Sequence, residues 1–77
     1  MNKYVITGTC IVDEPQTIVV TPEFAHDIFY ALCGFNGCDV DAITSSTTNK
    51  GVTEYELLDD DGNIIASMET ELSDNND

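Results

Sequence analysis

The stretch EYELLDDDGNIIASMETEL, residues 54–72, decides the fold of this chain because it has the pattern of a β-hairpin. Apolar and polar residues alternate on both sides of Asp61-Gly62, a pair that favours a two-residue type I′ turn. Such a turn fixes which residues of the two strands face each other. It predicts the pairs Asp60 with Asn63, Leu58 with Ile65, Leu57 with Ala66, Tyr55 with Met68, Glu54 with Glu69, and Val52 with Glu71.

This register separates the hairpin into an apolar face and an acidic face. The apolar face carries Tyr55, Leu57, Ala66, Met68 and Leu72, and the acidic face carries Glu54, Glu56, Glu69 and Glu71 with Ser67 between them. A three-residue loop, Asp60-Asp61-Gly62 with a bulge, would shift the register by one residue and put Glu54 opposite Met68. Because that shift mixes the two faces, we favour the two-residue turn.

The chain before the hairpin supplies two strands. Residues 3–12 (KYVITGTCIV) are rich in β-branched side chains and predict a strand. Pro15 marks a turn over residues 13–16, since it cannot continue a ladder, and residues 17–20 (TIVV) predict the returning strand.

A helix follows. Thr21 is suited to the N-cap, Pro22 to the first helical position and Glu23 to the positive end of the helix dipole. Gly34 or Gly37 is expected to end the helix. Apolar residues recur within it at spacings of three and four. They predict a buried stripe of Phe24, Ile28, Ala31, Leu32 and Phe35.

Residues 39–48 (DVDAITSSTT) predict a third strand with Val40 and Ala42 facing inward, and residues 47–51 predict a turn. The order of elements is therefore β-β-α-β-β-β. This order predicts an α+β fold, an antiparallel sheet of about four to five strands with one helix packed on one face. We expect a single domain over residues 1–72 and a flexible acidic tail over residues 73–77.

Charge is the unusual property of this chain. It has fifteen Asp and Glu, two Lys and no Arg, for a formal net charge of −13. A net charge of about 2–8 in magnitude is enough to keep a small domain soluble. The surplus indicates a positively charged partner, and it excludes direct binding of nucleic acid as the main activity, since Arg and Lys make phosphate contacts. A solvated face that protects a sheet edge from aggregation is the alternative explanation.

The compartment follows from the termini and the cysteines. The N-terminus has no apolar run of the kind found in secretory signals, and no segment approaches the roughly 20 apolar residues of a membrane span. Cys10, Cys33 and Cys38 are an odd number of cysteines. We therefore expect a cytoplasmic protein with reduced thiols and no membrane partner.

The run DDDGN at residues 59–63 resembles a calcium-binding loop at first sight. An EF-hand needs oxygen ligands at alternate positions, glycine at the sixth and a bidentate glutamate at the twelfth. With Gly62 as the sixth position, the first is Leu57 and the twelfth is Met68, so the pattern does not fit.

No motif predicts an enzyme or a cofactor. His26 with Cys10, Cys33 and Cys38 could supply zinc ligands, but the cysteine spacing is only loosely typical of zinc sites. Cys10 and Cys33 suit a core as small apolar side chains. His26 is the only histidine, and nothing in the sequence places a nucleophile and an orienting group against it. We expect a protein that is not an enzyme.

The absence of Arg, the charge of −13 and the acidic residues of the hairpin resemble those of small acidic phage-encoded inhibitors of bacterial defence. This class includes anti-CRISPR proteins and nucleic-acid mimics that block restriction enzymes or uracil-DNA glycosylase. The resemblance covers the whole chain and rests on composition. It implies an inhibitory protein that occupies a basic, nucleic-acid-binding surface, such as that of a Cas effector, in the cytoplasm of a bacterial host cell.

The expected partner-binding surface is the acidic hairpin with the acidic segment that precedes the third strand. Residues two apart on one strand face lie about 6.6–6.8 Å apart, close to the phosphate spacing along a single nucleic-acid strand. The candidate residues are Glu54, Glu56, Asp59, Asp60, Asp61, Glu69, Glu71, Asp39 and Asp41. The rival hypothesis is a non-enzymatic phage or host adaptor that binds a protein through a sheet edge or the helix face.

Overall fold

Five antiparallel strands and one helix make up the fold, in the predicted order β-β-α-β-β-β. The computed structural model describes residues 1–71, so the predictions for Leu72 and for the tail over residues 73–77 lie outside the described residues. The elements are β1 (Asn2–Thr7), β2 (Gln16–Val20), α1 (Pro22–Phe35), the short 3-10 helix η1 (Val40–Ala42), β3 (Ile43–Thr47), β4 (Thr53–Leu58) and β5 (Ile64–Thr70).

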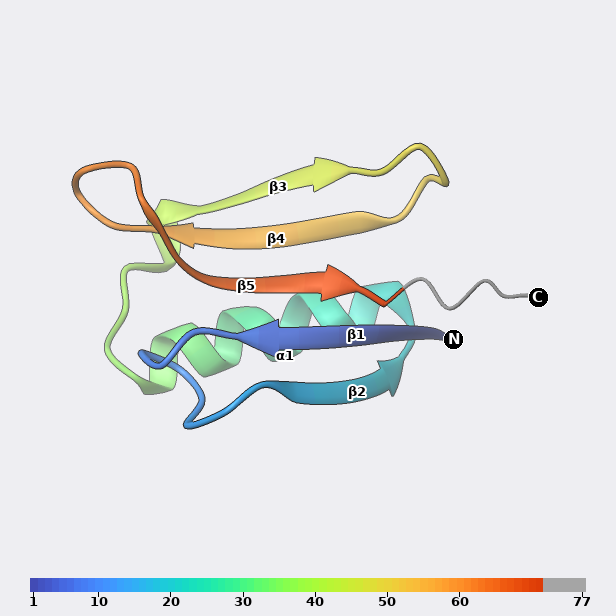
Figure 1. The fold of residues 1–77 in the computed structure, drawn as a ribbon, viewed down its shortest axis with the longest axis horizontal. Helices are drawn as coiled ribbons and strands as arrows, with labels where there is room; N and C mark the ends of the chain where they lie inside the picture. The colour runs from blue at the N-terminus through green and yellow to red at the C-terminus, as the bar shows by residue number, and fades with distance from the viewer. Residues whose placement is uncertain (72–77) are drawn as a thin grey trace.

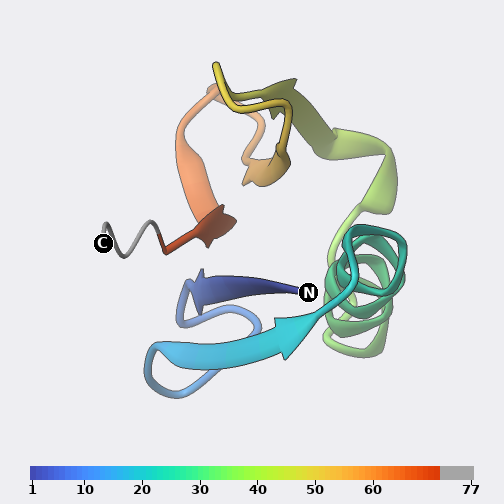
Figure 2. The same ribbon diagram turned by 90° about the vertical axis from the view of Figure 1, so that its right-hand side faces the viewer.

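The strands form one sheet in the order β2-β1-β5-β4-β3 (Figure 1). β5 therefore lies in the centre, where it pairs with β1 at the start of the chain and with β4 in its own hairpin. Figure 2 shows the strands in an arc with α1 on its concave side. The predicted α+β fold with one helix on one face of the sheet is confirmed.

The core lies between that concave face and the helix. The predicted apolar face of the hairpin is buried, with exposed fractions of 8% for Tyr55, 1% for Leu57, 2% for Ala66 and 0% for Met68. β1 adds Tyr4 and Ile6 from the same side of the sheet. The complete buried cluster is Tyr4, Ile6, Ile11, Ala25, Phe29, Cys33, Tyr55, Leu57, Ala66 and Met68.

The final hairpin contains both of the registers that its sequence allows. Along most of its length Tyr55 pairs with Met68 and Leu57 with Ala66, as the two-residue turn predicts. Next to the turn, however, Leu58 pairs with Ile64, which is the register of the alternative loop. Ile65 is the extra residue between these two pairs, so it forms a β-bulge that joins one register to the other.

The predicted type I′ turn is wrong. The Asp59 and Asn63 backbones pair across a three-residue loop, with the Asp59 N–H donating to the Asn63 carbonyl at 2.9 Å. Within the described residues only glycines have positive φ, and in this loop that residue is Gly62 at 86°. A type I′ turn needs positive φ at Asp61 as well, which is costly for a residue with a Cβ.

The first strand is shorter than its composition predicts. Residues 3–12 were expected to be extended, but β1 ends at Thr7 and the chain turns at Gly8. The amides of Ile11 and Val12 both donate to the Gly8 carbonyl, at 3.0 and 2.9 Å. Gly8 has a φ of 123°, a conformation that the β-branched residues around it do not adopt.

Helix α1 begins and ends where the sequence predicts. The Thr21 hydroxyl accepts the Phe24 amide at 3.4 Å, and Pro22 is the first helical residue. Asn36 caps the other end, and Gly37 follows with a φ of 75°.

The predicted buried stripe of this helix is wrong in part. Ala25, Phe29 and Cys33 are buried, and Ile28 and Leu32 are half-buried beside them, whereas Phe24, Ala31 and Phe35 are exposed. Apolar residues occupy most of the helix circumference, so their spacing alone does not select one face. The small side chains of Ala25 and Cys33 let the helix approach the sheet on either side of Phe29.

The segment before β3 is also different from the prediction. Residues 40–42 form η1 instead of extended strand, because the Asp39 carboxylate accepts the Asp41 amide at 2.9 Å and holds the chain in a turn. Val40, predicted to face inward, is 38% exposed, and Ala42 is half-buried. The strand begins only at Ile43.

Candidate partner-binding surface

Three loops and the end of the helix meet at one end of the molecule (Figure 1). They are the β1–β2 loop, the connection from α1 through η1 to β3, and the β4–β5 loop, all on the left in that view. Together they carry seven carboxylates, which we call the acidic end. Its members are Asp13, Glu14, Asp39, Asp41, Asp59, Asp60 and Asp61.

Side-chain contacts join these segments to one another. The Asn36 amide group, just after α1, donates to the Ile11 carbonyl in the β1–β2 loop at 3.5 Å. In the same loop the Cys10 thiol donates to the carbonyl of Ile65, the bulge residue of β5, at 3.5 Å. Pairing of Ile43 with Leu57 brings the start of β3, and η1 before it, beside the end of β4. These contacts link the loops of the acidic end to one another.

Two of its carboxylates stabilise the loops that carry them. Asp59 accepts hydrogen bonds from the amides of Asn63 and Asp61, at 2.8 and 2.9 Å. The Asn63 backbone bond, followed by the Asp61 bond, holds the pKa of Asp59 below its usual value. Asp39 caps η1 in the same way. Asp59 is half-buried and Asp39 is exposed, and both also contribute negative charge to this end of the molecule.

The remaining five carboxylates of the acidic end are exposed and accept no side-chain hydrogen bond within the part of the chain described. They are Asp13, Glu14, Asp41, Asp60 and Asp61. Helix α1 points its C-terminus towards them (Figure 1), and that terminus carries about half a negative charge. The field at this end is therefore more negative than the side chains alone would make it.

Neither lysine of the chain lies there. Lys50 is in the turn between β3 and β4, at the opposite end of a molecule whose longest dimension is 39 Å. Lys3 is near the start of β1, where its ammonium group forms an ion pair with Glu71 at 3.3 Å. That distribution leaves the acidic end without a cationic side chain.

The predicted acidic face of the hairpin is weaker than its sequence indicates. Glu54 turns into the gap between β4 and β5, where its carboxylate accepts the amide and the hydroxyl of Thr70, both at 2.9 Å. Glu71 is paired with Lys3. Only Glu56, half-buried, and Glu69, exposed, keep carboxylates without such a partner among residues 1–71.

The structure thus divides the predicted site residues into two groups. Asp39, Asp41 and Asp59 to Asp61 come together at the acidic end, where Asp13 and Glu14 join them. Glu54, Glu56, Glu69 and Glu71 lie on the outer, convex side of β4 and β5. Sequence reasoning missed Asp13 and Glu14 because they were assigned only to a turn, and nothing local indicates which other loops that turn faces.

Apolar side chains are exposed beside the acidic loops. Phe35, at the end of α1, is 90% exposed, and Ile64, the first residue of β5, is 57% exposed. Val40 in η1 and Ile65 in the bulge are partly exposed as well. Aromatic and aliphatic anchors surrounded by charge are typical of protein-binding surfaces.

Within the described residues, the cysteines and the histidine are not gathered into a zinc site. Cys33 is buried at the end of α1, while His26 is exposed near its start. Within residues 1–71, no three His, Cys, Asp or Glu side chains are arranged to hold a metal ion. Burial, with Cys38 and Cys10 nearby, raises the pKa of Cys33 to about 11, so this thiol packs as a small apolar side chain.

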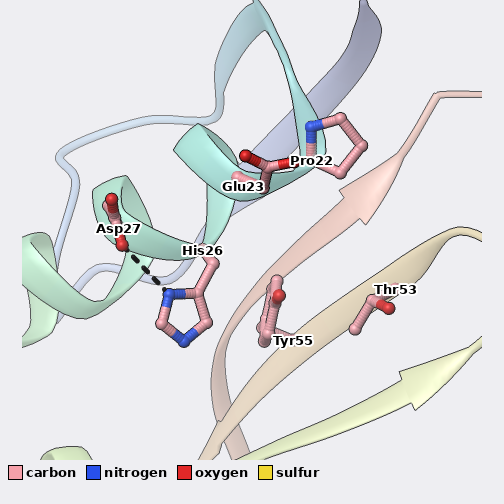
Figure 3. Close-up of a pocket in the computed structure, with 6 residues that line it drawn as sticks. All are labelled: Pro22, Glu23, His26, Asp27, Thr53 and Tyr55. Atoms are coloured by element: carbon pink, nitrogen blue, oxygen red, sulfur yellow. Dashed lines mark hydrogen bonds and ion pairs between the residues drawn. The ribbon is translucent and has the colours of Figure 1, made fainter.

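A separate pocket lies at the other end of the molecule, between the first turns of α1 and the start of β4 (Figure 3). It has a volume of about 400 Å³ and is lined by Pro22, Glu23, His26, Asp27, Thr53 and Tyr55. No local pattern in the sequence indicates this pocket, because its two walls are more than twenty-five residues apart in the chain.

Comparison of the chain with protein families, with curated proteins and with solved structures finds no match. Within the described residues, no helix has the length and apolar character required to cross a bilayer.

Proposed function

We propose that this protein is a non-enzymatic inhibitor that places its acidic end on a basic, nucleic-acid-binding surface of another protein. The partner we propose is a nucleic-acid-handling complex of bacterial defence, such as a Cas effector, and the compartment is the bacterial cytoplasm. The observation that carries the proposal is the gathering of seven carboxylates at one end of the sheet, with both lysines elsewhere.

Physical chemistry favours this use of the charge. Carboxylates held close together repel one another and disfavour the compact state. A basic groove relieves that repulsion, and the long-range attraction between opposite potentials speeds the encounter of the two proteins. A groove that accepts the phosphates of a nucleic acid, spaced at one charge per about 1.7 Å of duplex, presents the required density of Lys and Arg.

The proposal makes the inhibitor a competitor of nucleic acid. Carboxylates of the acidic end would pair with the Lys and Arg that otherwise bind phosphates, and the exposed Phe35 would supply an apolar anchor beside them. Glu56 and Glu69 on the convex side of the sheet form a smaller acidic group that we propose as an extension of the surface.

The test is capture of partners from bacterial lysate on the immobilised protein, at low and at high salt. We expect nucleic-acid-binding proteins to be retained at low salt, released at high salt, and displaced by added duplex DNA. The double variant Asp60→Asn with Asp61→Asn should reduce capture several-fold. Its matched control, Glu56→Gln with Glu69→Gln, removes the same charge from the convex side and should reduce capture less.

Two results would contradict the proposal. Capture that persists at high salt and is unaffected by DNA would exclude competition for a basic groove. Equal effects of the two double variants would show that net charge, and not the acidic end, determines binding.

A second candidate is an adaptor that binds a protein through a sheet edge or the helix face. The exposed Phe35 and Phe24 on α1, and the free edges of β2 and β3 in the sheet, favour it. This function predicts capture that is insensitive to salt and is abolished by Phe24→Ser, a residue that the acidic end does not include. The same lysate experiment therefore distinguishes the two functions.

A further inference from the structure

The pocket between α1 and β4 has an aromatic wall. The ring of His26 stacks on Tyr30 with a centroid separation of 4.3 Å and meets Tyr55 edge-on at 5.6 Å. In Figure 3 the ring of Tyr55 lies between His26 and Thr53, below Pro22 and Glu23. Planar groups and cations both bind favourably against such rings.

Tyr55 carries a polar group that has no partner in the protein. Its side chain is 8% exposed, yet its hydroxyl forms no hydrogen bond with any of the residues that the structure describes. Burial is the main cause that raises the pKa of Tyr55, so the hydroxyl stays protonated. A tyrosine hydroxyl at the wall of a pocket, with no hydrogen bond to the described protein, is free to accept a hydrogen bond from a ligand.

The rim of the pocket is acidic. Glu23 and Asp27 lie on the same side of α1, and the Asp27 carboxylate is 3.2 Å from Nδ1 of His26. The amino end of α1 contributes about half a positive charge nearby, but two carboxylates outweigh it. Neither carboxylate is paired with a lysine in the described part of the chain. The pocket therefore favours a cation.

We propose that this pocket binds the side chain of an arginine presented by a protein partner. The guanidinium group is planar and weakly hydrated, so it stacks on aromatic rings while its N–H groups donate to carboxylates. Here the rings are those of His26 and Tyr55, the carboxylates are those of Glu23 and Asp27, and the Tyr55 hydroxyl accepts a further N–H. Proline and the threonine methyl group would cover the aliphatic stem.

This inference rests on the proposed function only in its choice of a basic partner. The pocket is built by the first turns of α1 and the start of β4, whereas the acidic end is built at the opposite ends of those elements. A contact at both ends would require the partner to span the length of the molecule. If the pocket does not bind arginine, the function proposed for the acidic end is unchanged.

The test uses the isotopically labelled protein and the blocked tripeptide acetyl-Gly-Arg-Gly-amide, at an ionic strength of about 0.15 M, where screening acts beyond about 8 Å. We expect saturable NMR shift changes at His26, Thr53 and Tyr55. Analogues with lysine or with citrulline, which has the same shape without the charge, serve as the ligand controls. The lysine peptide should bind more weakly and the citrulline peptide should not bind.

Variants of the protein then locate the site. Glu23→Gln with Asp27→Asn should weaken arginine-peptide binding about tenfold or more, the usual effect of losing charge-assisted hydrogen bonds. Tyr55→Phe keeps the ring and should weaken binding by a few-fold. Asp60→Asn with Asp61→Asn makes the same change of charge at the distant acidic end and should leave the affinity unchanged.

Three results would overturn the proposal. They are equal binding of the arginine and citrulline peptides, shift changes centred on the β4–β5 loop instead of the pocket, and an unchanged affinity in the Glu23→Gln, Asp27→Asn protein. If the peptide binds as expected while lysate capture fails, the pocket stands and the proposed inhibitory function falls.

Discussion

Replacing Gly8 with alanine should destabilise this protein more than the same replacement at any other glycine with positive φ among the described residues. Gly8 lies where β1 ends against the bulge of β5, with a φ of 123°. A Cβ built there would lie 2.6 Å from the Cα and the Cβ of Ala66 and 2.6 Å from the carbonyl oxygen of Ile65. Two of these three atoms belong to the backbone of the central strand, which cannot move without disturbing its pairing.

The expected loss follows from two contributions. Backbone strain in a glycine-only conformation costs about 1–3 kcal/mol. Overpacking against a fixed neighbour costs about another 1–3 kcal/mol. A chain of 77 residues has a total stability of about 4–12 kcal/mol, at about 0.05–0.15 kcal/mol per residue. Gly8→Ala should therefore remove about half of the free energy of unfolding.

Urea unfolding followed by circular dichroism measures this loss. Gly51→Ala is the matched control, because Gly51 also has positive φ, at 81°, but has no atom within 4 Å of the added Cβ. We expect the control to lose only the backbone contribution, about 1–2 kcal/mol. If Gly8→Ala is no less stable than Gly51→Ala, the close approach of β1 to the bulge is not present in solution.

Two further predictions concern ionisable groups. Asp59→Ala should lower the urea midpoint clearly more than Asp60→Ala, because only the Asp59 carboxylate accepts the loop amides; equal midpoints would contradict that role. The raised pKa of Cys33 contributes stability that is complete below pH 9, the value of the free thiol, and is lost as the pH rises towards 11. At about 1.4 kcal/mol per pKa unit the loss is about 2–3 kcal/mol. Cys33→Ala should reduce the alkaline loss of stability measured by urea unfolding, with a smaller part remaining from Cys38 and Tyr55, whose pKa values are also raised; an unchanged alkaline dependence would refute the role of Cys33.

Local patterns predicted much of this fold. Thr21-Pro22 starts the helix and Gly37 follows its cap, because capping depends on a few adjacent residues. The alternation of Tyr55 and Leu57 with Glu54 and Glu56 set the buried face of β4, because successive side chains of a strand point to opposite sides. These predictions needed no information about distant residues.

Other predictions failed where the local structure is determined by a contact with a distant residue or by a competing hydrogen bond. Phe24 and Phe35 fit a helical stripe, but the sheet packs on the neighbouring face that carries Phe29. The Asp61-Gly62 pair favours a two-residue turn, yet the Asp59 side chain stabilises a longer loop and Ile65 absorbs the change of register. The sequence predicts Glu54 as a free surface charge, but in the structure its carboxylate accepts a hydrogen bond from the Thr70 amide.

The candidate site was likewise predictable in part from the sequence and in part only from the tertiary structure. Composition by itself determined the surplus of negative charge, fifteen carboxylates against two lysines, and that surplus is the basis on which a basic partner is proposed. The tertiary structure alone decided where that charge is concentrated. Pairing of β5 with both β1 and β4 brings loops from three parts of the chain to one end, and it leaves an aromatic pocket at the other. Such placement depends on strand order, and strand order is set by long-range burial that no local pattern encodes.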